Sequence, residues 1–317
     1  MTEYLRKQET KTILKFSSVI GLAFLSIFVL PVQLRDLYII LIKVLLNTNE
    51  AGAIEAINSS YVSAATYSIV LTSISFIVPF VLITKLFFRE KISNVISTDK
   101  PKCSVQMLLC LFVLSLGFCY VGNQSSHAVS LFMDNVFGVT PVMADFPDAV
   151  NWFDIIFSVV SIAIIPALLE EFAFRGAILG FLKRFGKINA IIISSILFAI
   201  MHGNFVQIPF AFFVGLALGF ITIATDSIWP AIIVHAFNNF LSIVVSYYPN
   251  LYYLLFICFI FGISVLVYLI INKPFADAFK EGVFYNSNAK RFSLIIFNPV
   301  IIIGIAFFIY EACSMVR

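Results

Sequence analysis

Charged residues are scarce in this sequence. Only 12% of its 317 residues are Asp, Glu, Lys or Arg, about half the share of a soluble domain, so an ordinary soluble globular protein is excluded. The 61% of hydrophobic residues also excludes intrinsic disorder, which needs low hydrophobicity and high charge. No basic patch interleaves with aromatic residues, so nucleic acid is not an expected partner. What remains is a polytopic membrane protein.

Several chemical motifs are missing as well. The five cysteines form no C-x-x-C pair and lie in or beside apolar runs, so we expect buried thiols and no disulfide framework. The absence of H-E-x-x-H excludes a zincin-type protease. Ser194 and Ser195 lack a G-x-S-x-G context, which argues against a serine nucleophile. An intramembrane aspartyl protease needs two Asp residues within its spans, whereas the Asp residues of this chain lie in loops or at span edges.

Long apolar runs are what the chain has instead. Each is close to the roughly 20 residues that cross a bilayer, so they predict an all-α polytopic protein with about eight to nine transmembrane helices. The first run follows basic residues without a cleavage site and is expected to remain uncleaved. A weaker run at 37–46 is expected to be an interfacial or outer-loop helix. The predicted spans are 13–34, 61–84, 104–121, 153–182, 188–203, 206–224, 228–247, 251–271 and 293–312.

The chain is expected to comprise three consecutive parts. Residues 1–150 would hold about three spans and an outer loop, residues 151–250 the catalytic core, and residues 251–317 the last membrane helices. Lys and Arg gather in alternate loops, whereas residues 122–151 contain three Asp and no Lys or Arg. Because basic loops stay in the cytoplasm, we expect a cytoplasmic N-terminus.

Ionisable side chains within spans are the main functional signal, because each costs about 2.5–3.5 kcal/mol to insert. Glu170, Glu171 and Arg175 lie in the fourth predicted span. Lys183 marks the cytoplasmic end of this run, so the helical rise places Glu170 roughly 20 Å inside the membrane. Pro166, one turn earlier, is expected to kink the span and open space among the helices.

Two histidines and an asparagine reach a similar depth on other spans. The same rise places His202 about 22 Å from its basic flank, and His235 and Asn239 about 14 Å and 20 Å from Asp226. A carboxylate beside an imidazole could deprotonate water, and a second imidazole and an amide could stabilise an oxyanion. His127, in the predicted outer loop, is expected to be a solvated surface residue.

Other interpretations of these polar groups stay open. Interhelical hydrogen bonds could be their only role, above all for Glu171 and Arg175, whose i,i+4 spacing permits an ion pair within one helix. Glu170, His202 and His235 could bind zinc in the manner of a His₂Glu catalytic site. Their spacing fits a site with a divalent metal and a site without a cofactor equally well.

Three short motifs resemble those of the CAAX protease and bacteriocin-processing family (CPBP, Abi-type), intramembrane endopeptidases described as metalloproteases. The motifs are Glu170-Glu171-Phe-Ala-Phe-Arg175, Phe198-Ala-Ile-Met-His202 and His235-Ala-Phe-Asn-Asn239. Their order and their location in apolar spans, within about 70 residues, make the match specific, and it covers roughly residues 155–247.

The resemblance implies a role for each motif residue. Glu170 and His202 would activate the attacking water, and His235 and Asn239 would stabilise the tetrahedral oxyanion. The remaining motif residues, Glu171, Arg175 and Phe198, would bind substrate or shape a site that opens to the cytoplasm.

We therefore expect an integral membrane endopeptidase, in a bacterial plasma membrane, that cleaves a membrane-associated peptide or protein in contact with the lipid bilayer. The alternative is a non-catalytic membrane protein, either a transporter or a bacteriocin-immunity or partner-binding protein, that retains the polar cluster. Transporters more often have two related halves with paired broken helices, and this sequence has no such internal symmetry.

Overall fold

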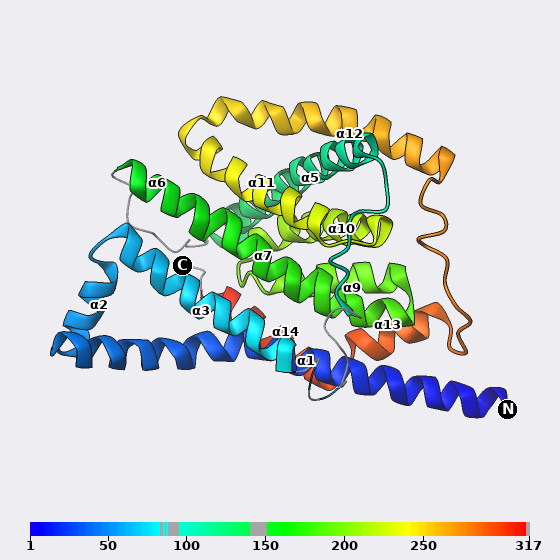
Figure 1. Ribbon diagram of the computed structural model, residues 1–317, viewed down its shortest axis with the longest axis horizontal. Helices are drawn as coiled ribbons and strands as arrows, with labels where there is room; N and C mark the ends of the chain where they lie inside the picture. The colour runs from blue at the N-terminus through cyan, green and yellow to red at the C-terminus, as the bar shows by residue number, and fades with distance from the viewer. Residues whose placement is uncertain (83–84, 86, 88–94, 140–150, 315–317) are drawn as a thin grey trace.

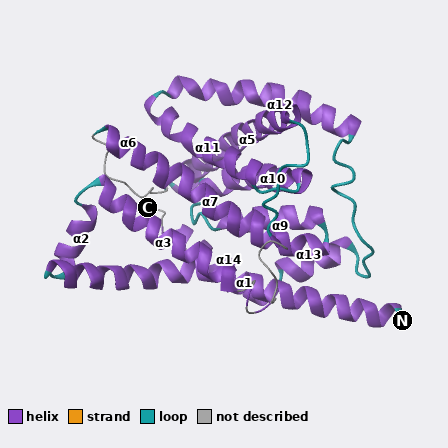
Figure 2. Cartoon of the chain, viewed as in Figure 1, coloured by secondary structure: helices purple, strands orange, loops and turns teal. Residues whose placement is uncertain are grey.

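A computed structural model describes residues 1–82, 85, 87, 95–139 and 151–314. Four residues that contributed to the predicted orientation lie outside this part of the chain. They are Arg89 and Lys91, in a basic loop, and Asp145 and Asp148, in the acidic segment 122–151. All regular secondary structure among the described residues is helical, and Figure 2 shows helices joined by loops without a strand. The all-α prediction is therefore confirmed.

The helices follow one another along the chain with few long loops between them. They are α1 (Thr2–Leu46), α2 (Glu50–Asn58), α3 (Tyr61–Leu82), α5 (Val105–Phe137), α6 (Trp152–Ser158), η2 (Val159–Ile164), α7 (Ile165–Glu171), η3 (Phe172–Ile178), α8 (Leu179–Leu182), η4 (Lys183–Phe185), α9 (Lys187–Ile200), α10 (Gln207–Thr225), α11 (Trp229–Tyr247), η5 (Pro249–Leu251), α12 (Tyr252–Asn272), α13 (Asn288–Ile296) and α14 (Pro299–Ser314).

The described residues contain seven helices that are long and apolar enough to cross a membrane, or eight if α13 and α14 form one span bent by 58°. This roughly matches the predicted eight to nine. The difference lies mainly in α9, which has only 14 residues. Its predicted span continues to residue 203, but Gly203 has a φ of 59°, which an α-helix cannot contain.

Two predicted boundaries are wrong. The run at 37–46 is not a separate interfacial helix but the end of α1, because no residue breaks the helix before Asn47, which adopts the left-handed conformation. Helix α5 runs to Phe137 rather than ending near residue 121, and only Gly138 at φ 64° ends it. His127 thus lies on a helix and not in a loop, although its side chain is exposed as expected.

The fourth predicted span is one long helical segment that contains two π-helical segments. Pro166 is the second residue of α7 and lacks the N–H that would continue the hydrogen-bond ladder. The π-helical segment η2 directly precedes α7, and the second one, η3, follows Glu171. Such π-segments are rare and often occur at functional sites.

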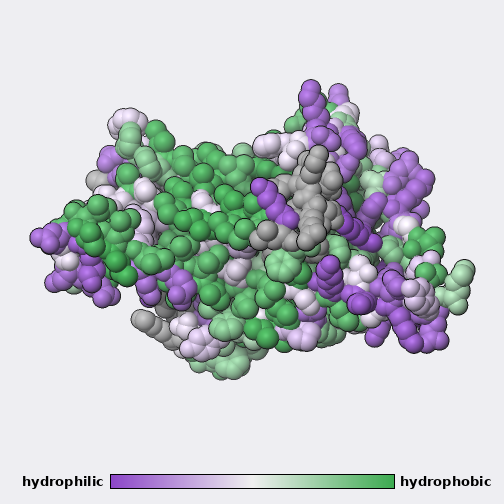
Figure 3. All heavy atoms as spheres, turned by 60° about the horizontal axis from the view of Figure 1, so that its bottom comes forward, coloured by the Kyte–Doolittle hydropathy of each residue, from purple (hydrophilic) through white to green (hydrophobic). Residues whose placement is uncertain are grey.

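Most long helices run along the longest axis of the molecule (Figure 1). Helix α12 packs against α5, and α1 packs against α14 and α3, with α12 and α1 at opposite edges of the view. The loop from residue 273 to 287 descends from α12 to α13 at the end where the N-terminus lies. In Figure 3 hydrophobic residues fill much of the middle of the visible face and hydrophilic residues gather toward its ends, as expected of a membrane protein.

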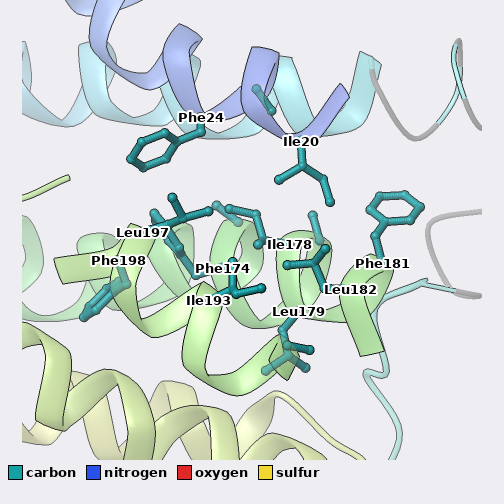
Figure 4. Close-up of a cluster of buried hydrophobic side chains, with 14 of the residues drawn as sticks. Ile20, Phe24, Phe174, Ile178, Leu179, Phe181, Leu182, Ile193, Leu197 and Phe198 are labelled. Atoms are coloured by element: carbon teal, nitrogen blue, oxygen red, sulfur yellow. The ribbon is translucent and has the colours of Figure 1, made fainter. Parts of the chain in front are cut away.

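The core lies between α1 and the segments that carry the predicted catalytic residues. Phe24 of α1, Phe174 of η3, and Leu197 and Phe198 of α9 are almost completely buried. Figure 4 shows Leu197 on the side of α9 that faces Phe24, while Phe198 points away from α1. Lipid tails are as apolar as these side chains, so close van der Waals packing contributes more here than removal of surface from water.

Gly21 allows α1 and α14 to approach closely. A Cβ atom at Gly21 would lie 2.9 Å from the backbone nitrogen of Ile301. We expect Gly21→Leu to destabilise the protein by about 1–3 kcal/mol, the usual cost of overpacking, although leucine itself favours a helix. Thermal unfolding of the purified protein in detergent measures this effect. Gly282→Leu, at a position with nothing within 4 Å, should leave the Tm unchanged; an equal Tm for both variants would contradict the proposed contact.

Candidate active site

The motif residues come together from three parts of the helical bundle. Glu170 and Glu171 end α7, and Arg175 follows on η3. Phe198 lies on α9, while His235 and Asn239 lie one turn apart on α11. Helix α11 packs against both α7 and η2, which brings its polar residues to the glutamate pair.

Glu171 forms two hydrogen bonds, both through Oε1, while its Oε2 has no partner among the described residues. Its Oε1 accepts hydrogen bonds from Arg175 Nη1 at 2.9 Å and from His235 Nδ1 at 2.8 Å, and its side chain has no exposed surface. The second Arg175 nitrogen, Nη2, donates to the carbonyl oxygen of Gly215 on α10 at 3.2 Å. Glu171 therefore joins α7, η3 and α11, and Arg175 extends the connection to α10.

Glu170 has a different environment. Its side chain is 13% exposed, and its Oε2 has no hydrogen-bond partner among the described residues. This oxygen lies 3.8 Å from His235 Nε2, too far for a direct hydrogen bond. Because Glu171 accepts the proton on Nδ1, a neutral His235 presents a lone pair at Nε2. Two acceptors thus face each other, a shared donor would lie to one side of the line between them, and Glu170 keeps a free carboxylate oxygen.

The aromatic ring of Phe198 contacts both imidazoles. It lies edge to face with His202 and His235, at centroid distances of 5.0 Å and 5.7 Å. The Arg175 guanidinium carbon lies 4.2 Å from the ring centroid, a distance typical of a cation–π interaction. Phe198 thereby sets the spacing between the two histidines.

His202 lies just beyond the end of α9 and not within a helix. Its Nδ1 contacts the carbonyl oxygen of Phe198 at 2.8 Å. That oxygen is an acceptor, so Nδ1 carries the proton in this arrangement, and Nε2 is left as the basic nitrogen. The ring is half-buried, which leaves it accessible from one side.

Asn239 bonds to the π-helical segment η2 beside it. Its Nδ2 donates to the carbonyl oxygen of Ile162 in η2 at 3.3 Å, a carbonyl in the π-helical segment before Pro166. The preceding Asn238, which the motif analysis did not single out, is buried and donates to Asn239 Oδ1 at 3.4 Å. The pair of adjacent asparagines was the only signal in the sequence that could have identified this residue.

The residues suggested for zinc do not form a metal site as they are arranged. No group of three His, Cys, Asp or Glu side chains in the described part of the chain is placed to hold a metal ion. His235 Nδ1 and His202 Nδ1 are both occupied by hydrogen bonds, so only their Nε2 atoms could bind a metal. We therefore derive no step of the chemistry through a metal.

A family model covers this part of the chain. Residues 152–241 match the model described as type II CAAX prenyl endopeptidase Rce1-like. The segment contains all seven motif residues and agrees with the CPBP resemblance, which is thereby confirmed. No curated protein and no solved structure matches the chain.

The different environments of the two glutamates can be tested by matched substitutions. Glu171→Gln removes the only charge that pairs with buried Arg175, and removing one partner of a buried ion pair usually costs about 3–5 kcal/mol. Glu170→Gln removes a charge without a bonded partner, so we expect a change below about 1 kcal/mol. Unfolding of both variants in detergent measures the difference. Equal stabilities would show that the ion pair contributes little.

Proposed function

Since residues 152–241 carry an Rce1-like CAAX endopeptidase segment, we propose that this protein is an intramembrane endopeptidase that hydrolyses a peptide bond in a membrane-associated peptide or protein. The observation that most supports the proposal is the unpartnered Oε2 of Glu170 beside His235 in an apolar helix. A carboxylate without a partner is costly at this depth, and a structural role would be served better by a bonded one.

In this proposal Glu170 acts as the general base. It accepts a proton from a water molecule as the water oxygen attacks the carbonyl carbon of the scissile bond. His202, whose Nε2 is basic when Nδ1 bonds to the Phe198 carbonyl, assists in this proton transfer. The proton then passes to the leaving amine, so that the C–N bond breaks and both carboxylate and amine are released.

The other motif residues support this step. His235 and Asn239 stabilise the oxyanion of the tetrahedral intermediate. His235 does so as the imidazolium, whose Nε2–H donates while Nδ1–H stays bonded to Glu171. Glu171 thus acts through His235, because its hydrogen bond holds the orientation of that ring and its charge favours the protonated form. Arg175 neutralises Glu171, and Phe198 maintains the spacing of the imidazoles.

Water is activated here by Glu170 and His202 directly. Zinc analysis of the purified protein, together with its activity, tests this part of the proposal. If the protein contains stoichiometric zinc, and if its removal abolishes cleavage and its return restores cleavage, direct activation of water by Glu170 and His202 is replaced by a metal-dependent mechanism.

The proposed location is the plasma membrane of a bacterium, with the N-terminus and the site opening on the cytoplasmic side. Lys290 lies near the N-terminal end of α13 and Lys43 near the far end of α1; Lys290 is exposed and Lys43 is half-buried. In cells that express single-cysteine variants, we expect a membrane-impermeant maleimide to label Lys43→Cys and not Lys290→Cys until the cells are lysed. The opposite pattern would reverse the orientation.

Substitution of the proposed base tests the activity itself. We expect Glu170→Gln and His202→Ala each to lower the cleavage rate by at least about 100-fold, in line with the typical contribution of general-base catalysis. His127→Ala removes the one histidine outside the motifs, which is exposed on α5, and should retain full activity. The measurement is quantitative mass spectrometry of membrane peptides in cells that lack the protein and are complemented with each variant.

Two results would argue against this function. Full cleavage by Glu170→Gln would exclude Glu170 as the base. A peptide profile that does not change when the protein is lost would favour the non-catalytic alternative, a transporter or an immunity or partner-binding protein.

A further inference from the structure

A polar cavity with basic residues in its wall lies outside the candidate active site. It has a volume of about 500 Å³ and is bordered by residues from four parts of the chain: 95–102, 175–187, 222–226 and 274–278. Four cationic side chains line it, and they come from two of these parts. They are Lys102, Arg175, Lys183 and Lys187.

Carboxylates balance only half of this positive charge. Lys102 pairs with Asp226, and Arg175 pairs with Glu171. The other acidic residue of the wall, Asp277, pairs with Lys280 outside the cavity. Among the described residues, neither Lys183 nor Lys187 forms an ion pair with a carboxylate, so the wall has an excess of two positive charges.

Lys187 is held in place without being neutralised. Its Nζ donates to the carbonyl oxygens of Ala278 and Lys280 at 2.8 Å and 2.7 Å. An ammonium group has three N–H donors, so one remains for a ligand. Lys183 is half-buried, which limits the water available to solvate its charge.

Arg175 also borders the cavity. Its side chain is completely buried, and its Nε has no hydrogen-bond partner among the described residues. Buried N–H groups without a partner are rare, because each costs about 1–3 kcal/mol. A bound acceptor that reached this N–H would remove this cost.

This cavity is distinct from the place where water is activated. Glu170, His202 and His235 do not border it; Arg175 is the only motif residue that does. Pro274 and Phe275 also form part of the wall of a neighbouring apolar cavity of about 440 Å³ between α5, α10 and α12, which has Lys273 among its residues. An apolar cavity beside a basic one suits a ligand with a hydrocarbon chain and an anionic group.

We propose that the basic cavity binds a phosphate group, held by Lys183, Lys187 and Arg175 Nε. A phosphate monoester carries close to two negative charges at neutral pH, which equals the excess charge of the wall. Its oxygens accept several charge-assisted hydrogen bonds at once, matching three donors from different directions. The phosphate could be free in solution or part of a phospholipid headgroup whose acyl chain enters the apolar cavity.

Binding experiments on the full-length protein in detergent test the proposal and separate the two sources. Isothermal titration calorimetry with inorganic phosphate reports a free anion, and native mass spectrometry with phosphatidic acid, compared with phosphatidylcholine, reports a lipid. We expect saturable binding in at least one arm. Lys183→Gln and Lys187→Gln should each weaken it about tenfold, because each removes one charge-assisted contact.

Matched variants keep the result interpretable. Lys290→Gln removes an exposed lysine of α13 that does not border this cavity and should bind like the unmodified protein. Lys183→Arg preserves the charge and should retain binding, which distinguishes a lost contact from a misfolded variant. No binding in either arm, or equal binding by Lys183→Gln and the unmodified protein, would overturn the proposal. The outcome does not depend on peptidase activity, since binding alone is measured.

Discussion

The structure around the proposed site depends on the burial of one negative charge, that of Glu171. A carboxylate in an apolar interior is tolerated only when its charge and lone pairs are compensated. Arg175 and His235 supply this compensation from one turn along the same helical segment and from α11. Arg175 in turn satisfies a carbonyl on α10, so a single charge determines how several helices must lie together.

This arrangement separates two chemically identical neighbours. Glu171 bonds to Arg175 and His235 through Oε1, whereas Glu170 forms no hydrogen bond among the described residues. One residue along a helix changes the direction of a side chain by about 100°, which here means facing the arginine or facing the imidazole Nε2. In the proposed reaction, stability and chemistry are thus divided between the two members of one pair.

The irregular backbone complements the polar cluster. Two π-helical segments border α7, and α9 ends before His202 rather than spanning the membrane. Within a bilayer, backbone that is not α-helical is tolerated only where protein or a water-filled space surrounds it. The hydrogen bonds from Asn239 to η2 and from His202 to α9 show how side chains of the cluster satisfy carbonyls at these irregular positions.

Much about this protein was determined by the sequence alone, because it depends on composition and on residues close together in the chain. Low charge and long apolar runs established an all-α membrane protein, and three short motifs identified the candidate residues. Helix ends were less predictable: residues 37–46 continue α1, and α5 extends to Phe137, because an apolar or weakly polar run continues a helix until a residue such as Asn47 or Gly138 ends it. Only the tertiary structure decided which glutamate is paired, where Arg175 places its remaining donors, and which lysines surround one cavity. Those contacts join residues up to about a hundred positions apart, and they depend on how each helix is rotated and packed, which no local pattern specifies.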